Sequence, residues 1–151
     1  MVIKTNKAFV QSAGGLAVRA RAREFEIAID EPTSIGGTNT GMTPAELVLS
    51  ALGACQTIVA MAFARRWGIA IEEYRVELEG DIDTDGYKGL SDVRSGYLEI
   101  RYRVHVKSEA PPERIREYVK FVESICPVGD TIANPVRVAM DGIHIDKYKK
   151  T

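Results

Sequence analysis

Two cysteines, Cys55 and Cys126, are the side chains in this sequence whose type and surroundings are best suited to chemistry. In a reducing compartment, two cysteines are more often free, catalytic or redox-sensing thiols than a structural disulfide. If the two thiols meet in the fold, one can attack an oxidant and the other can resolve the resulting sulfenic acid as a disulfide. Their separation along the chain does not show that they meet, so two inert core cysteines are the competing interpretation.

The two cysteines have different sequence surroundings. Cys55 lies in the middle of the longest apolar run, where a thiol is unreactive unless a cation or a set of hydrogen-bond donors stabilises its thiolate. Cys126 is followed by Pro127 and an expected helix start, where free backbone N–H groups can stabilise a thiolate. The groups that face each thiol therefore decide between chemistry and an inert core.

Two sets of charged residues could supply such groups. Arg19, Arg21 and Arg23 recur at period two, so an extended strand would place all three guanidinium groups on one face. That face either is solvated or lies against the Cys55 helix, where an arginine would stabilise a thiolate. Glu46 likewise either only caps its helix or orients such an arginine.

Residues 43–67 are expected to form the helix that carries Cys55. Thr43 with Glu46 three residues later has the form of a capping box. Pro44 falls at the first helical position, where its missing N–H costs nothing. Apolar side chains occur on every face of this helix, so we expect it to be buried.

The charge-free stretch at 47–64 also approaches the length of a membrane span. However, it is rich in Ala and Gly, contains Ser50, Gln56 and Thr57, and stands alone among amphipathic segments. A central core helix is therefore the preferred interpretation, and we expect no membrane partner.

The rest of the chain alternates between strand and helix patterns, without repeats or a linker. This order predicts a single α+β domain over residues 1–151, a length that suits one hydrophobic core. The expected elements are strands at 4–11 and 16–30 separated by a turn at Gly14-Gly15, an antiparallel strand pair at 74–79 and 98–107, an amphipathic helix at 111–125, a short helical turn at 127–133 and a closing strand at 136–145.

The charge balance and the N-terminus bear on partners and location. The chain has 20 Lys and Arg against 21 Asp and Glu, so no strong positive field recruits nucleic acid, and we expect no nucleic-acid partner. The first ten residues lack a basic segment followed by an apolar signal core. A cytoplasmic location is therefore expected.

An acidic loop imitates the start of a calcium-binding loop. Asp81, Asp83 and Asp85 have the spacing of the first EF-hand ligands, but strand patterns rather than helices flank them. His105 and His144 each stand on an expected strand without a second ligand at metal-binding spacing. We therefore expect a solvated loop, surface histidines and no metal site.

The segments around the two cysteines carry a family resemblance. The sequence DEPTSIGGTNTGMTPAELVLSALGAC at 30–55, followed by VESICPVGDTIANPV at 122–136, resembles the OsmC/Ohr family. This family comprises osmotically inducible protein C and the organic hydroperoxide resistance proteins. The specific parts are the Gly-Gly loop, the Thr-Pro-x-Glu-Leu helix start, the Ala-Cys within the helix and the late Cys-Pro-Val, and the element order matches over nearly the whole chain.

The resemblance implies a fold and an activity. The fold would be an intertwined homodimer in which curved antiparallel sheets surround a long buried central helix, with active sites at the subunit interface. The activity would be that of a thiol-dependent peroxidase, in which Cys55 attacks an organic hydroperoxide, Cys126 is the resolving thiol, and an external dithiol restores both. No metal or organic cofactor is required for such a reaction.

Two departures from the family pattern concern the residues that activate the thiol. In family members with established peroxidase chemistry, the carboxylate that pairs with the catalytic arginine precedes the cysteine by one residue more than Glu46 does, and Ala45 stands there. The arginine that follows the Gly-Gly turn is replaced by Leu16, which leaves Arg23 as the best substitute, with Arg21 and Arg19 as alternatives. The alternative is a non-catalytic OsmC-like dimer that senses redox state or binds an apolar ligand.

Overall fold

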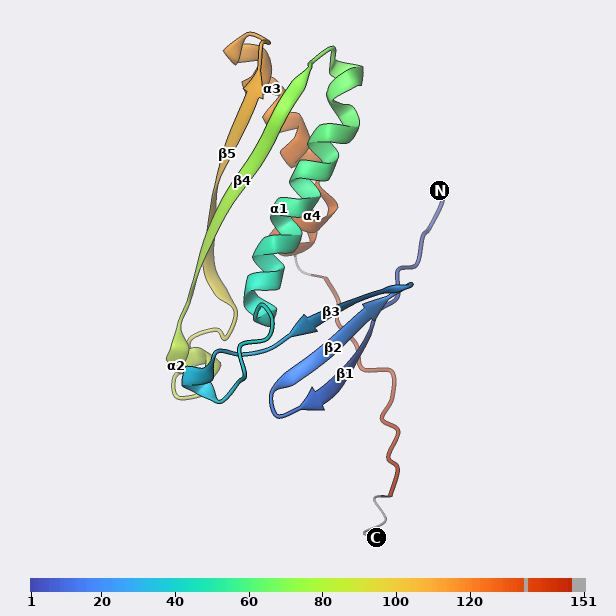
Figure 1. Ribbon diagram of the computed structural model, residues 1–151, viewed down its shortest axis with the longest axis vertical. Coiled ribbons are helices and arrows are strands. Elements are labelled where there is room, and N and C mark those ends of the chain that lie inside the picture. The colour runs from blue at the N-terminus through green and yellow to red at the C-terminus, as the bar shows by residue number, and fades with distance from the viewer. Residues whose placement is uncertain (135, 148–151) are drawn as a thin grey trace.

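The computed structural model describes residues 1–134 and 136–147, which form two separate antiparallel sheets and a set of helices (Figure 1). The three-stranded sheet has the order β1-β2-β3, and the second sheet is the pair β4-β5. The elements are β1 (Phe9–Gly14), β2 (Ala17–Ala22), β3 (Phe25–Ile29), the 3-10 turn Thr33–Ile35, α1 (Pro44–Phe63), the 3-10 turn Ala64–Trp67, β4 (Ile71–Ile82), α2 (Thr84–Tyr87), β5 (Tyr97–Ser108), α3 (Pro112–Ser124) and α4 (Pro127–Ala133). This is the predicted α+β class.

Helix α1 begins with the capping box that the sequence predicts. The Glu46 backbone N–H donates to the Thr43 hydroxyl at 3.2 Å, and the Thr43 N–H donates to the Glu46 carboxylate at 2.8 Å. Pro44 is the first helical residue. The helix runs on into the 3-10 turn and ends at Gly68, whose φ of 67° lies in the left-handed region that glycine adopts easily.

One face of α1 packs against the β4-β5 sheet, with α3 and α4 beside it (Figure 1). A Cβ atom on Gly53 would lie 2.7 Å from the Leu78 side chain, so glycine permits α1 to approach β4 closely. The Tyr118 hydroxyl, from α3, donates to the Ala60 carbonyl of α1. The core is formed by Ala60, Ala64, Ile69, Tyr74, Tyr118 and Val122.

Strands β4 and β5 confirm the predicted antiparallel pair. Val76 pairs with Val104, and Leu78 pairs with Tyr102, so these side chains share the face that α1 covers. Charged residues alternate with them on the other face, where Arg101 forms ion pairs with Asp81 and two glutamates. The sheet therefore has one apolar side for the core and one solvated side.

The N-terminal sheet has three strands where the sequence predicts two. The turn at Gly14-Gly15 is confirmed, but the long run at 16–30 is broken by a second turn at Arg23 and Glu24. Arg23 has a φ of 57°, which no extended strand allows, and Ala22 pairs with Phe25 across the turn. The prediction that Arg23 continues the strand face of Arg19 and Arg21 is therefore wrong.

The loop between β3 and α1 is organised by one buried carboxylate. Asp30 accepts hydrogen bonds from the backbone N–H and the hydroxyl of both Thr38 and Thr40, and from the Glu31 N–H. The hydrogen bond from the Thr38 hydroxyl is the main reason that the pKa of Asp30 lies well below its ordinary value. Burial alone would raise this pKa. A Cβ on Gly37 would lie 1.8 Å from the Glu31 carbonyl oxygen, so the Gly-Gly motif serves close backbone packing.

The closing strand predicted at 136–145 is absent from the described part of the chain. Residues 136–147 have no regular structure and extend past the three-stranded sheet toward the C-terminus (Figure 1). Apolar side chains along this segment, such as Val138 and Ile145, are exposed. A strand needs an adjacent edge that supplies hydrogen bonds, and within the single chain this segment lies along neither sheet.

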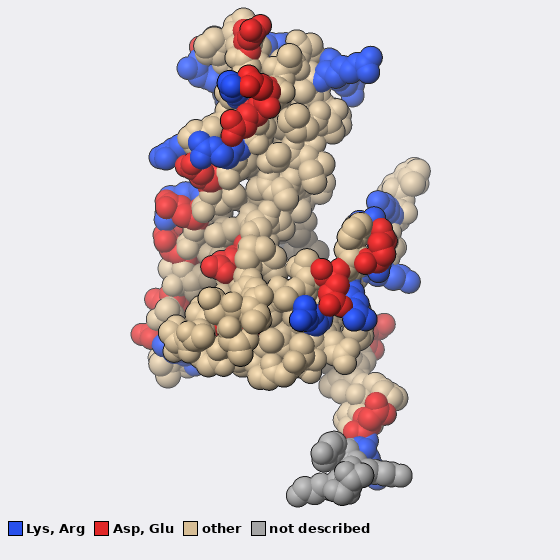
Figure 2. All heavy atoms as spheres, viewed as in Figure 1, with Lys and Arg blue, Asp and Glu red and all other residues tan. Residues whose placement is uncertain are grey.

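The face of α1 that points away from the sheet is exposed in the single chain. Ile58 is 68% exposed, and Val48 and Met61 are also exposed, so the helix predicted to be buried on all sides is buried on one. Figure 2 shows that charged side chains gather over the strands and chain ends, whereas the middle of the molecule is largely uncharged. By length and composition, Pro44–Trp67 would suffice to cross a membrane, a property that core helices share.

Candidate active site

The junction between α3 and α4 fixes the position of Cys126. Helix α3 ends at Ser124, and Cys126 is the N-cap residue of α4 with Pro127 in the first helical position. The Gly129 backbone N–H donates a hydrogen bond to the Cys126 sulfur at 3.4 Å. Cys126 is only 2% exposed, so its thiol is held in one place by burial and by this hydrogen bond.

The structure brings Cys126 and Cys55 together. Both are free thiols, and Cys55 on α1 is half-buried. The pKa of Cys126 is raised, mainly by burial and also by the adjacent Cys55 thiol. The hydrogen bond from the Gly129 N–H acts in the opposite direction and lowers this pKa. The two thiols are therefore neighbours that influence each other electrostatically.

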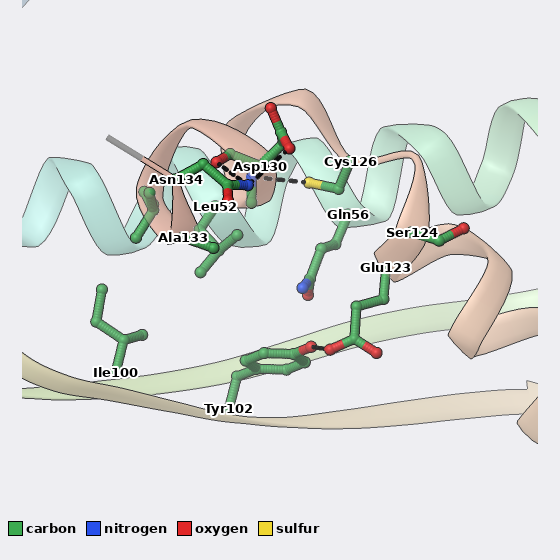
Figure 3. A pocket seen from close by; sticks show the side chains of 12 residues that line it. Leu52, Gln56, Ile100, Tyr102, Glu123, Ser124, Cys126, Asp130, Ala133 and Asn134 are labelled. Carbon is green, nitrogen blue, oxygen red and sulfur yellow. Dashed lines mark hydrogen bonds between the residues drawn. The ribbon is translucent and has the colours of Figure 1, made fainter. Parts of the chain in front are cut away.

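A pocket of about 400 Å³ opens beside Cys126 (Figure 3). Side chains from α1, β5, α3 and α4 line it, so residues far apart in the sequence form one site. Apolar atoms form the larger part of its surface, and polar and charged side chains such as Gln56, Glu123 and Asn134 also line it. The lining residues are Leu52, Gln56, Ile100, Tyr102, Glu123, Ser124, Cys126, Gly129, Asp130, Ile132, Ala133 and Asn134.

Three polar side chains at this pocket were not singled out by the sequence analysis. The Tyr102 hydroxyl donates a hydrogen bond to Glu123, and the Gln56 side chain extends from α1 toward Tyr102 (Figure 3). Gln56 is 3% exposed, and its Oε1 has no hydrogen-bond partner among the described residues. Burial and the Glu123 carboxylate raise the pKa of Tyr102 to about 12, while the Gln56 amide opposes this shift.

A sequence signal for these residues exists but is weak. Gln56 is a polar residue within the apolar run of its helix, and Tyr102 stands at an inward position of an alternating strand. Neither pattern reveals that the two side chains face each other, because that depends on how α1 crosses β5.

The three arginines of the N-terminal sheet lie away from this pocket in the single chain. Arg19 and Arg21 pair with Glu26 across the β2-β3 ladder. Arg23, at the turn, has a 75% exposed side chain that lies over the Phe25 ring and near Glu24. The three-stranded sheet projects away from α1 and the β4-β5 sheet (Figure 1). Within one chain, the expected contact between Arg23 and Cys55 is therefore not made.

Glu46 has its carboxylate engaged at the start of α1. It accepts the Thr43 N–H and stands nine residues before Cys55, about 13 Å along the helix axis. Within one chain the Glu46 carboxylate is therefore a helix cap that does not reach the thiol. The acidic loop likewise uses Asp83 to cap α2, and no group of three or more potential metal ligands occurs in residues 1–134 and 136–147.

Known proteins resemble this chain in sequence and structure. The family model described as OsmC-like protein matches residues 37–141. A hydroperoxide reductase from Mycoplasma genitalium is 27% identical over 119 residues, which are 77% of this chain and 78% of that relative. An OsmC-like protein from Mycoplasma pneumoniae has a crystal structure with a TM-score of 0.78 at 24% identity, covering 89% of this chain and 91% of that chain.

An organic hydroperoxide resistance protein OsmC from Legionella pneumophila shares the fold at greater sequence distance. Its crystal structure gives a TM-score of 0.62 at 15% identity, covering 87% of this chain and 91% of that chain. The family model spans the loop at Gly37, the helix with Cys55 and the segment with Cys126. It thus contains the start of α1 and both cysteine motifs, and the chain belongs to the OsmC-like protein family.

Proposed function

We propose that this protein is a thiol-dependent peroxidase that reduces organic hydroperoxides. The observation that carries the proposal is a pair of neighbouring free thiols, Cys55 and Cys126, of which Cys126 lines a pocket whose surface is largely apolar. The relative from Mycoplasma genitalium is named a hydroperoxide reductase, which supports a peroxide-related redox role.

The surroundings of the two thiols suggest how they divide the reaction. Cys126 is buried, and burial raises its pKa, so it remains a protonated thiol at neutral pH. Cys55 is half-buried and is the thiol to which we assign the attack on peroxide. Its thiolate forms an S–O bond as the O–O bond breaks, which leaves Cys55 as a sulfenic acid and releases an alkoxide.

The second thiol completes the cycle. Cys126 attacks the sulfenic sulfur, a disulfide forms, and the sulfenic oxygen leaves as water. An external dithiol then reduces the disulfide by exchange and is itself oxidised. The pocket walls are apolar, as with Leu52 and Ile100, so they favour an organic hydroperoxide over hydrogen peroxide. The proposed chemistry calls on thiols alone and on no metal or organic cofactor.

We propose that the working unit is a homodimer located in the cytoplasm. The exposed apolar face of α1, with Ile58 and Met61, needs cover in water, and a second copy would supply it. The extended segment 136–147 carries exposed apolar side chains that a second copy could also bury. In such a dimer, an arginine of the partner's N-terminal sheet would be the candidate to reach Cys55.

The test is the rate of Cys55 oxidation by an alkyl hydroperoxide. We expect stopped-flow mixing of the reduced protein with cumene hydroperoxide to show rapid, second-order consumption that a dithiol reductant makes catalytic. Cys55→Ser should abolish it, because serine is not oxidised by hydroperoxides. If Cys55→Ser consumes peroxide at the wild-type rate, the proposal fails.

A second function is favoured by one observation. No arginine or lysine is among the residues lining the pocket in the described chain. Within one copy, the pocket therefore lacks a cation that would stabilise a thiolate and polarise a bound peroxide. A dimer that binds an apolar ligand or senses redox state would need no such group. Tight binding of an apolar ligand without peroxide turnover would support this function, whereas rapid turnover would exclude it.

A further inference from the structure

The pocket beside Cys126 offers hydrogen-bond acceptors and negative charge but no cationic side chain. Two carboxylates, those of Glu123 and Asp130, are among its lining residues. Both residues are exposed, so they carry their charge in contact with water. Among residues 1–134 and 136–147, no lysine, arginine or histidine lines the pocket. The potential inside it therefore disfavours an anionic ligand and attracts a cationic one.

Gln56 contributes an acceptor that the rest of the chain leaves unused. The residue is 3% exposed, and its Oε1 has no hydrogen-bond partner among the described residues. Its side chain lines the pocket and extends from α1 toward Tyr102 (Figure 3). Leaving a buried acceptor unpaired is costly, so such atoms are usually satisfied by a bound molecule or by water. The Gln56 carbonyl therefore offers a position for a ligand that carries a hydrogen-bond donor.

The Tyr102 hydroxyl lies between the buried acceptor and the charge. It donates its one hydrogen to the Glu123 carboxylate, so it has none left for Gln56. Gln56 and Glu123 approach this hydroxyl from different helices, one from α1 and the other from the end of α3 (Figure 3). A carboxylate can accept several hydrogen bonds, so Glu123 can still bind a second donor. One ligand head group beside Tyr102 can therefore contact both acceptors.

These groups define the chemical class of the ligand. An ammonium group has a positive charge and three N–H donors, which match one amide carbonyl and one carboxylate. The pocket walls at Leu52 and Ile100 are apolar and suit a hydrocarbon body. We propose that the pocket beside Cys126 binds a small alkylammonium ion, whose head group donates to Gln56 Oε1 and to the Glu123 carboxylate. This inference does not depend on the proposed peroxidase function, because binding requires no peroxide.

Probes that share one hydrocarbon tail test each part of the head group. Isothermal titration calorimetry of the reduced protein, in a phosphate buffer free of amines, compares n-hexylammonium, 1-hexanol, hexyltrimethylammonium and hexanoate. We expect hexylammonium to bind most tightly. Hexanol lacks the charge and hexyltrimethylammonium lacks the N–H donors, so each should bind about tenfold more weakly. Hexanoate should show no measurable binding, because the carboxylates of the pocket repel it.

A further probe, Nα-acetyl-lysine amide, distinguishes a small amine from the lysine side chain of another protein. It carries an ammonium head on a body with polar amides. We expect it to bind about tenfold more weakly than hexylammonium, because its amides would lose water against the apolar walls at Leu52 and Ile100. Equal or tighter binding would show that the pocket receives a lysine side chain, and the proposal of a small ion would fail.

Variants of the two acceptors locate the site. Gln56→Met removes the carbonyl, so it should weaken hexylammonium binding about tenfold and leave hexyltrimethylammonium binding unchanged. Glu123→Gln should weaken the binding of both cations by about fivefold or less, because Glu123 is exposed, and should not affect hexanol. The matched control is Glu117→Gln on the same helix. Its carboxylate pairs with Arg114 and does not line the pocket, so we expect no change in any affinity.

Several outcomes would overturn the inference. Equal affinities for all the probes would show that the pocket selects only the hydrocarbon tail. The proposal also fails if hexanol binds more tightly than hexylammonium, if no probe binds, or if Gln56→Met and Glu123→Gln both leave hexylammonium binding unchanged. A thermal melt of each variant is the control for folding, and Glu123→Gln tests the site at an exposed position, outside the core. The peroxidase function is judged separately, by the rate of Cys55 oxidation.

Discussion

At the scale of single residues, the backbone turn at Cys126 defines the site. Helix α3 ends there and α4 begins, so the thiol is buried and receives a hydrogen bond from Gly129. Burial raises the pKa of Cys126, so its thiol is protonated at neutral pH. A buried thiol next to a half-buried one is therefore suited to the second step of the cycle rather than the first.

This division of roles predicts different products for the two serine variants. In Cys126→Ser, one equivalent of cumene hydroperoxide should convert Cys55 into a sulfenic acid that persists, because no neighbouring thiol can resolve it. Mass spectrometry should show one added oxygen, and a sulfenic-acid probe should label the protein. The wild-type protein should instead lose two hydrogens as its disulfide forms.

The reverse assignment would leave a clear signature. If Cys55→Ser reacts rapidly with peroxide and Cys126→Ser does not, Cys126 is the attacking thiol. Serine in place of either cysteine changes volume little, so a thermal melt of both variants serves as the control for folding.

At the scale of elements, the loop before α1 depends on Asp30. Its carboxylate binds both Thr38 and Thr40 and thereby holds the Gly-Gly turn against β3. The same loop delivers the chain to the cap at Thr43, and so it fixes where α1 begins. The position of α1 against β4 follows from this start and from the close approach at Gly53.

The lowered pKa of Asp30 predicts a dependence of stability on pH. A carboxyl whose folded-state pKa lies below its unfolded value contributes stability that is complete above about pH 4 and is lost as pH falls further. We therefore expect Asp30→Asn to lower the Tm by several degrees at pH 7. The difference between the variant and the wild type should shrink as the pH falls below 4.

Circular dichroism melts between pH 7 and pH 3 measure this dependence. Asp92→Asn, in the exposed loop before β5, is the matched control, for which we expect no change in Tm. An equal loss of Tm at every pH would show that the Asp30 side chain acts by shape rather than by charge.

At the scale of the whole molecule, one side of the protein is incomplete in a single copy. The outer face of α1 exposes Ile58 and Met61, and the three-stranded sheet projects from the rest of the fold (Figure 1). Surfaces of this kind mark interfaces in proteins that are dissolved in water. The proposed homodimer would cover this face and bring charged groups of a partner toward the cysteine pair.

A charge on the outer face of α1 should therefore break the dimer. We expect the wild-type protein to elute with about twice the single-chain mass of 16.6 kDa in light-scattering chromatography. Ile58→Glu should shift it toward the single-chain mass, because a buried unpaired carboxylate is costly. Leu90→Glu, at another exposed apolar position, is the control and should remain dimeric. A wild-type protein that elutes as a single chain would contradict the proposal.

The sequence by itself determined the elements that local interactions specify. The capping box at Thr43, the alternation of β4 and β5 and the proline at the start of α4 are short-range signals, and each predicted element was found. Local patterns were insufficient at Arg23, where a left-handed turn splits a run of strand-forming residues. Local patterns also predicted a strand at 136–145 that the structure does not contain. A strand requires hydrogen bonds to a neighbouring strand, and this segment has no neighbouring strand within the single chain.

Only the tertiary structure decided which side chains share the site. The meeting of Cys55 with Cys126, and of Gln56 with Tyr102, depends on how α1 crosses the β4-β5 sheet and where α3 ends. Within one chain it also placed Glu46 at the start of α1 as a helix cap, which is one of the two roles that the sequence allows for this residue. Contacts between distant parts of the chain depend on packing geometry, which the spacing of residues along a sequence does not encode.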